Sequence, residues 1–101
     1  MARIGIVVAF RIKPGCRQKF EALLNDHIAK TRQEEPGCER FDMLHPLDHS
    51  GAADDSRLML YEVYRDQAAL DVHQGNPRLA AVRKAYASLI DSRELTICHL
   101  A

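Results

Sequence analysis

The sequence predicts a single α+β domain over residues 1–101, with the order strand, helix, strand, strand, helix, strand. Strands are indicated near both ends and in the middle, where apolar residues alternate with other residues. Helices are indicated between them, where apolar residues recur at spacings of three and four. Pro-Gly pairs at 14–15 and 36–37 separate the first three elements. We therefore expect a ferredoxin-like βαββαβ fold with an antiparallel four-stranded sheet.

The first half of the chain supplies a strand, a helix and a second strand. The first strand covers about 3–13, where the alternating apolar residues are Ile4, Ile6, Val8, Phe10 and Ile12. The helix covers about 16–34, and it ends at the second Pro-Gly pair because Pro cannot continue a helix. The second strand covers about 38–45. The small and polar residues 46–56 predict an exposed, mobile loop at the edge of the domain.

The second half is organised around residues 58–65, which form a strand with large side chains on both faces. One face carries Leu58, Leu60, Glu62 and Tyr64, and the other carries Met59, Tyr61, Val63 and Arg65. Asp66 is a good N-cap for the helix that follows, and residues 74–77 interrupt that helix. A further helix is predicted over about 77–91, and the alternation over 93–100 predicts the last strand.

Composition and charge exclude several classes of protein. Lys plus Arg equals Asp plus Glu at 14 each, so the chain offers no basic field for nucleic acid or for a membrane surface. Its longest apolar run, residues 6–10, is too short to span a bilayer, and its N-terminus lacks the regions of a signal peptide. Three widely spaced cysteines (Cys16, Cys38 and Cys98) do not form a disulfide pattern. We expect a cytoplasmic protein with reduced thiols that binds neither nucleic acid nor membrane.

The sheet face turned away from the helices is expected to need a cover. Its predicted residues include Val7, Ala9, Tyr61 and Val63, which are too apolar to form a large surface in water. A second copy packed sheet against sheet would bury them, so we expect a two-fold homodimer.

Several motifs spread over nearly the whole chain resemble those of one family. They are Lys13-Pro14-Gly15, Glu35-Pro36-Gly37-Cys38, Arg40-Phe41-Asp42 and Tyr61-Glu62-x-Tyr64-x-Asp66-x-x-Ala69-x-x-x-His73-x-x-x-Pro77. Together they resemble the antibiotic biosynthesis monooxygenase (ABM) family of the dimeric α+β barrel superfamily. The resemblance implies a ferredoxin-like protomer and a barrel-shaped dimer. Activities known in that family are cofactor-independent oxygenation of quinols and anthrones, isomerisation of a phosphorylated autoinducer-2 derivative, and haem degradation.

Two residues depart from the family pattern. Tyr64 stands where many members have Trp, and Arg78 stands where many have His. The chain contains no Trp, which weakens the resemblance to haem-degrading members, whose pocket typically has an aromatic wall that includes Trp. Tyr64, together with Phe41 and His27, is closer to the autoinducer-processing members.

The candidate catalytic residues are His73, Glu62 and Tyr64. An imidazole exchanges protons near neutral pH, so His73 is a candidate base, and the alternative is a structural histidine bonded to the backbone. Glu62 faces inward, where burial would raise its pKa and suit it to acid or base work. Tyr64 either donates its hydroxyl to a substrate oxygen or packs in the core. The alternative for Glu62 is an ion pair with Arg11, Arg40 or Arg65.

Three further residues are candidate substrate-binding groups. His27 either lines a pocket or is a satisfied core histidine, and the family resemblance adds Phe41. Arg78 either attracts an anionic substrate group beside a helix N-terminus or is a solvated charge. No pair of histidines has the spacing of a metal site, and no Gly-x-Gly-x-x-Gly loop is present, so we expect neither a metal nor a cofactor.

Three functional hypotheses follow. The first is a cofactor-independent monooxygenase acting on a quinol or another electron-rich, enolisable small molecule. The second is an isomerase or tautomerase of a small dicarbonyl compound, phosphorylated or not. The third is a non-catalytic module that binds a small ligand, which is favoured if Glu62 pairs with an Arg and His73 points into packed core.

Overall fold

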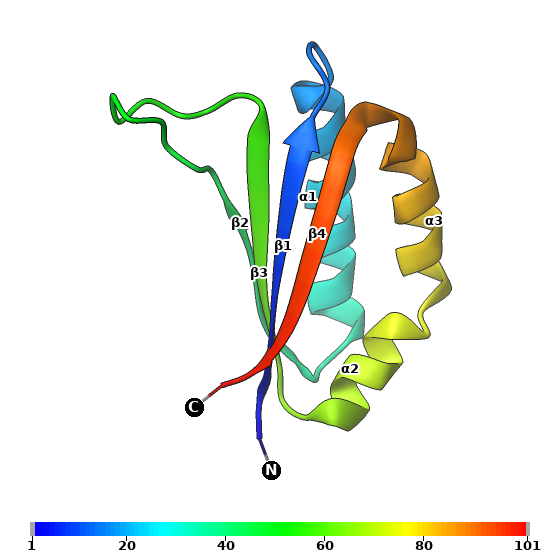
Figure 1. The fold of residues 1–101 in the computed structure, drawn as a ribbon. Coiled ribbons are helices and arrows are strands. Elements are labelled where there is room, and N and C mark those ends of the chain that lie inside the picture. The colour runs from blue at the N-terminus through cyan, green and yellow to red at the C-terminus, as the bar shows by residue number, and fades with distance from the viewer. Residues whose placement is uncertain (1, 101) are drawn as a thin grey trace.

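One antiparallel sheet and three helices form two layers, with the helices over one face of the sheet (Figure 1). The computed structural model describes residues 2–100. Its elements are β1 (Ile4–Ile12), α1 (Arg17–Glu34), β2 (Cys38–Leu44), β3 (Arg57–Tyr64), α2 (Gln67–Gln74), α3 (Pro77–Tyr86), the 3-10 turn η1 (Ala87–Leu89) and β4 (Ile90–His99). The strand order is β2-β3-β1-β4, which confirms the predicted ferredoxin-like α+β fold. No helix in this range is long and apolar enough to cross a membrane.

The alternation in β1 and β3 turns large side chains toward the helices, as predicted. The buried residues of these two strands on that side are Ile4, Ile6, Val8, Phe10, Ile12, Leu58, Leu60, Glu62 and Tyr64. Phe10 packs edge-on against Phe20 of α1 and Tyr86 of α3, with ring centroids 4.9 and 5.6 Å apart. This aromatic cluster anchors α1 and α3 on the sheet. Glu62 is the acid that β3 contributes to the same buried side.

The predicted end of the last helix and start of the last strand are wrong by a few residues. Helix α3 ends at Tyr86, η1 follows, and β4 begins at Ile90, which pairs with Ile12 beyond a register shift. The apolar spacing of Tyr86, Leu89 and Ile90 continues through the 3-10 turn. Periodicity alone therefore did not mark where the helix ends.

The segment between β2 and β3 is an exposed loop, as predicted, but it carries hydrogen bonds that its composition did not reveal. The Asp48 carboxylate accepts bonds from the N–H groups of Ser50 and Ala52, at 2.8 and 3.1 Å. Arg17 of α1 donates to the carbonyl oxygens of Asp54 and Asp55, at 3.2 and 3.0 Å. The loop is thus fastened to α1, and its mobility stays a prediction.

The turn between α1 and β2 brings the end of α1 against α2. The N–H of Glu35 donates to the carbonyl of Thr31, and the N–H of Cys38 donates to the carbonyl of Glu35. A Cβ at Gly37 would lie 2.4 Å from the Cβ of Ala69 in α2, so only glycine permits this approach. The turn therefore fixes Glu35 beneath α2, where its side chain is buried.

The edge strand β4 is open on the side that faces the helices. Leu95 and Ile97 lie opposite Val8 and Ile6 of β1 and share their face of the sheet, yet they are 36% and 48% exposed. The helices cover β1 and β3 but leave β4 beside an opening. This opening leads to the candidate site.

Candidate active site

A narrow cleft enters the layer between helices and sheet beside β4. Apolar residues of all four strands and of α1 and α3 form most of its lining, and the polar and charged groups in it are His27, Glu62, His73, Gln74, Arg83 and Arg93. Its free volume is about 30 Å³, which is room for about one water molecule. A molecule with an aromatic ring would enter only if side chains of the lining moved, and Leu95 of β4 is the exposed apolar residue among them.

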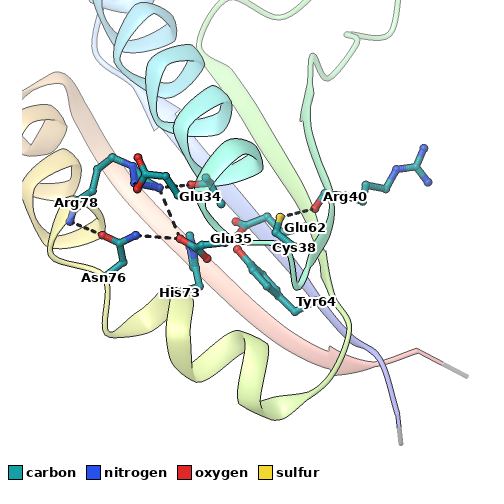
Figure 2. A network of polar contacts seen from close by, with 10 residues as sticks. Glu34, Glu35, Cys38, Arg40, Glu62, Tyr64, His73, Asn76 and Arg78 are labelled. Carbon is teal, nitrogen blue, oxygen red and sulfur yellow. Dashed lines mark hydrogen bonds and ion pairs between the residues drawn. The ribbon is translucent and has the colours of Figure 1, made fainter.

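His73, which lines this cleft, is held by Glu35, and Figure 2 shows the two side chains next to each other. The Nδ1 atom of His73 lies 3.0 Å from Oε1 and 3.3 Å from Oε2 of Glu35. Asn76 donates from Nδ2 to Oε2 of Glu35 at 3.1 Å, and an Arg78 nitrogen lies 3.6 Å from the same oxygen. A buried carboxylate is costly without partners, and here it has three.

The broken helix is what aims these groups at one another. Asp66 caps α2 by accepting a hydrogen bond from the Ala69 N–H at 2.9 Å, so His73 falls on the buried face one turn beyond. After the break, Asn76 caps α3 through Oδ1, which accepts from the Arg78 N–H at 3.0 Å. The Nδ2 of Asn76 stays free to reach Glu35. The interruption predicted at 74–77 thus positions part of the site.

The geometry defines the protonation state of His73. Since Nδ1 faces a carboxylate, Nδ1 carries the proton and donates it to Glu35, which leaves Nε2 with its lone pair. The Nε2 atom lies 3.7 Å from Oε1 of Glu62. Burial lowers the pKa of His73 below its ordinary value, and the Glu35 carboxylate opposes that shift. At neutral pH His73 is therefore a neutral imidazole whose basic nitrogen is directed at Glu62.

Glu62 and Tyr64, two residues apart on β3, are joined by a hydrogen bond. The Tyr64 hydroxyl donates to Oε1 of Glu62 at 2.7 Å. Burial raises the pKa of Glu62 to about 7, although the Tyr64 hydrogen bond and the positive charge of Arg83 both oppose the rise. Burial and the Glu62 carboxylate raise the pKa of Tyr64, so it stays a neutral donor. Tyr64 is fully buried and does not line the cleft, so its hydroxyl meets Glu62 behind the cleft wall.

His27 and Phe41 both line the cleft, as their assignment to substrate binding requires. The His27 ring lies 5.7 Å from the rings of Phe41 and His73. Burial lowers the pKa of His27 to about 4, helped by the neighbouring His73, so it is neutral. Its buried Nδ1 has no hydrogen-bond partner within residues 2–100. The structure does not show the satisfied core histidine of the alternative interpretation.

Arg78 does not face the cleft. Its guanidinium bonds to Glu34 at 2.7 Å and to the Thr31 hydroxyl at 3.0 Å, and it supports Glu35. Its charge is therefore engaged by α1.

The arginines considered as partners of Glu62 are not its partners within the described chain. Arg40 pairs with Asp42, Arg65 lies 3.7 Å from Asp66, and no ion pair joins Glu62 to Arg11. The sequence also did not single out Glu35 as a functional residue, because its place before Pro-Gly marked it only as a helix end. No group of three or more potential metal ligands occurs within residues 2–100.

The pKa of Glu62 makes stability depend on pH. Its pKa in the unfolded chain is near 4.5 and in the fold about 7, so its contribution is retained below pH 4.5 and is lost as pH rises through 7. We therefore compare the free energy of unfolding of Glu62→Gln with that of wild type. The difference, variant minus wild type, should be about 2–3 kcal/mol larger at pH 8 than at pH 5, because only wild type loses stability as Glu62 ionises. Urea titrations at the two pH values measure this. A difference between the two proteins that does not change with pH would show that Glu62 has an ordinary pKa.

Comparisons with known proteins agree with this fold. The model of the antibiotic biosynthesis monooxygenase family matches residues 3–85. Rv0793 of Mycobacterium tuberculosis, which has a provisional monooxygenase name, is 32% identical over 98 residues, covering 97% of this chain and 89% of its own. Its solved structure superposes with a TM-score of 0.75, covering 98% and 93% of the two chains. A Caulobacter crescentus protein of similar provisional name shares the fold at 21% identity and a TM-score of 0.89, covering 99% and 91%. The chain therefore belongs to the antibiotic biosynthesis monooxygenase family.

Proposed function

We propose that this protein is a monooxygenase that needs no cofactor and acts on a quinol or another electron-rich, enolisable small molecule. The observation that carries the proposal is the Glu35–His73 pair, with a neutral imidazole whose Nε2 is directed at Glu62 in a largely apolar cleft. A base of this kind removes a phenolic or enolic proton, and the resulting substrate anion can react directly with oxygen, without a metal or an organic cofactor. The family match and the provisional names of its relatives support the same reaction class.

The proposed steps balance without an external reductant. His73 Nε2 takes the proton of a substrate hydroxyl, and the Glu35 carboxylate stabilises the imidazolium that forms. The substrate anion supplies four electrons to one O2, so that one oxygen atom enters the product and the other leaves as water. A hydroquinone thereby becomes a hydroxyquinone plus water. Glu62, which is protonated below about pH 7, supplies a proton to the departing oxygen.

A second candidate, an isomerase or tautomerase of a small dicarbonyl compound, is favoured by the distance between the two proton carriers. His73 Nε2 and Glu62 Oε1 are 3.7 Å apart. One group could remove a proton from carbon while the other returns it to a different atom of the substrate. This reaction uses the same residues and no oxygen.

We also propose that the protein works as a homodimer, sheet against sheet. On the face away from the helices, Val7, Ala9 and Tyr61 are half-buried and Leu44 is 42% exposed in the single chain. A two-fold partner would cover these residues without blocking the cleft, which lies on the opposite face. Sedimentation as a single chain would contradict this arrangement.

We place the reaction in the cytoplasm. Cys16, Cys38 and Cys98 are all free thiols, which suits a reducing compartment. Recovery of the protein from a secreted fraction would contradict this.

Oxygen consumption tests the reaction class. A panel of hydroquinones and enolisable diketones is incubated with the enzyme in air and under nitrogen, and products are analysed by mass spectrometry. We expect oxygen uptake with the hydroquinones and one atom from ¹⁸O2 in the product. Conversion of a diketone that proceeds equally under nitrogen would overturn the monooxygenase in favour of the isomerase. No conversion in either gas would leave a ligand-binding module.

A further inference from the structure

We propose that the substrate carries a permanent anionic group, a carboxylate or a phosphate, which Arg83 of α3 and Arg93 of β4 bind at the mouth of the cleft. The inference rests on the proposed function, because it names the chemical class of molecule that enters the same site. Arg78, the arginine that the sequence suggested for this role, is already bound to Glu34 and Thr31.

Both arginines line the cleft, and both also line the shallow hollow that adjoins it. They come from different elements, α3 and β4, and Tyr86 lines both hollows together with them. Arg93 makes one long hydrogen bond, from Nη1 to the Tyr86 hydroxyl at 3.4 Å. Two forked donors thus line the cleft beside the exposed residue Leu95 of β4, and forked donors suit a planar or tetrahedral anion.

Neither guanidinium has a carboxylate partner in the described part of the chain. The arginines that have one are Arg3, Arg17, Arg40, Arg65 and Arg78. Asp91 lines the adjoining hollow, but it forms no ion pair with either arginine. Arg11, Arg32 and Arg57 also have no carboxylate partner within residues 2–100, yet they do not line the cleft. Two of the five arginines without a carboxylate partner in residues 2–100 therefore line this cleft.

The positive charge of Arg83 affects the pKa values of three groups that line the cleft. It lowers the pKa of His27, Glu62 and His73 together, so its field extends over the whole inner wall of the cleft. The acid nearest to the cleft, Glu62, is itself largely neutral below pH 7 and does not cancel this field. An apolar cleft with a positive mouth favours an amphipathic molecule whose anionic end stays at the entrance while its ring enters.

Pairs of matched substrates distinguish two roles for Arg83 and Arg93: binding a permanent anionic group, and stabilising the anion that forms during the reaction. The first pair is 3-(2,5-dihydroxyphenyl)propanoate and its primary amide, which have the same ring and nearly the same shape. The second pair is 2-(2,5-dihydroxyphenyl)ethyl phosphate and the corresponding alcohol, which distinguishes phosphate from carboxylate. The variants are Arg83→Gln, Arg93→Gln and their combination, and the control is Lys84→Gln, which removes an exposed charge next to Arg83 on α3.

We expect the wild type to prefer the anionic member of one pair by about ten- to a hundredfold in kcat/KM, since each bond between charged groups is strong. The double variant should reduce that ratio to about one, and Lys84→Gln should leave it unchanged. The proposal is overturned if the wild type shows no preference in either pair. It is also overturned if the double variant slows both members equally, because the arginines would then serve only the reacting oxygen.

Calorimetric measurement of binding of the same compounds under nitrogen tests the anion site independently of the monooxygenase proposal. Preferential binding of the anionic member, lost in the double variant, supports the anion site even if no oxygen is ever consumed. Oxygen uptake with equal binding of anion and amide would retain the monooxygenase and reject the anion site.

Discussion

Replacing His73 by glutamine is expected to lower kcat for hydroquinone oxidation by about 10²–10⁴-fold, the usual contribution of a positioned general base. Glutamine removes the basic Nε2 but offers an amide N–H that can still donate to Glu35. The loss should therefore appear in turnover and not in folding. Oxygen-electrode rates at saturating hydroquinone, together with thermal unfolding curves, measure both.

A histidine outside the site provides the control for this substitution. His49 lies in the exposed loop between β2 and β3, so His49→Gln should change neither rate nor melting temperature. Oxygen uptake by the His73→Gln protein equal to that of wild type would remove His73 from the mechanism, and with it the acid–base account of the cleft.

Replacing Glu35 by alanine is expected to lower the free energy of unfolding by about 2–5 kcal/mol, because the buried N–H donors of His73 and Asn76 lose their acceptor at about 1–3 kcal/mol each. Glu35 is 4% exposed, and its loss would remove the hydrogen-bond acceptor of His73 and Asn76 and one of the two carboxylates near Arg78. The adjacent Glu34 is a matched control: it also binds Arg78, but its side chain is 55% exposed. We expect Glu34→Ala to lose at most about 1 kcal/mol.

The isosteric variant Glu35→Gln tests the positioning role apart from stability. Because the Glu35 carboxylate raises the pKa of His73, removing its charge should lower that pKa further. The acid limb of the pH–kcat profile should then move to lower pH, while the rate on the plateau falls because the imidazolium is no longer stabilised. A uniform loss of rate at every pH, with no movement of the limb, would reduce Glu35 to a purely structural residue.

The order and faces of the strands were accessible from the sequence because they depend on local patterns. Alternation in β1 and β3 identified the buried sides correctly, including the inward position of Glu62. The Asp66 cap and the break before Pro77 likewise predicted where α2 starts and where α3 begins. The end of α3 was not accessible, since a 3-10 turn and a register shift preserve the same apolar spacing.

The chain by itself determined a ferredoxin-like fold and placed an acid and a phenol on one inner strand face, because period-two alternation and helix caps act over a few residues. Only the tertiary structure decided which groups meet. Glu35 reaches His73 across 38 residues because Gly37 lets α2 pack on the turn, and no local pattern encodes that approach. The same long-range packing engages Arg78 with α1 and leaves Arg83 and Arg93 at the cleft without a carboxylate partner among the residues that the structure describes. Ion pairing depends on distances in space and not on spacing along the chain.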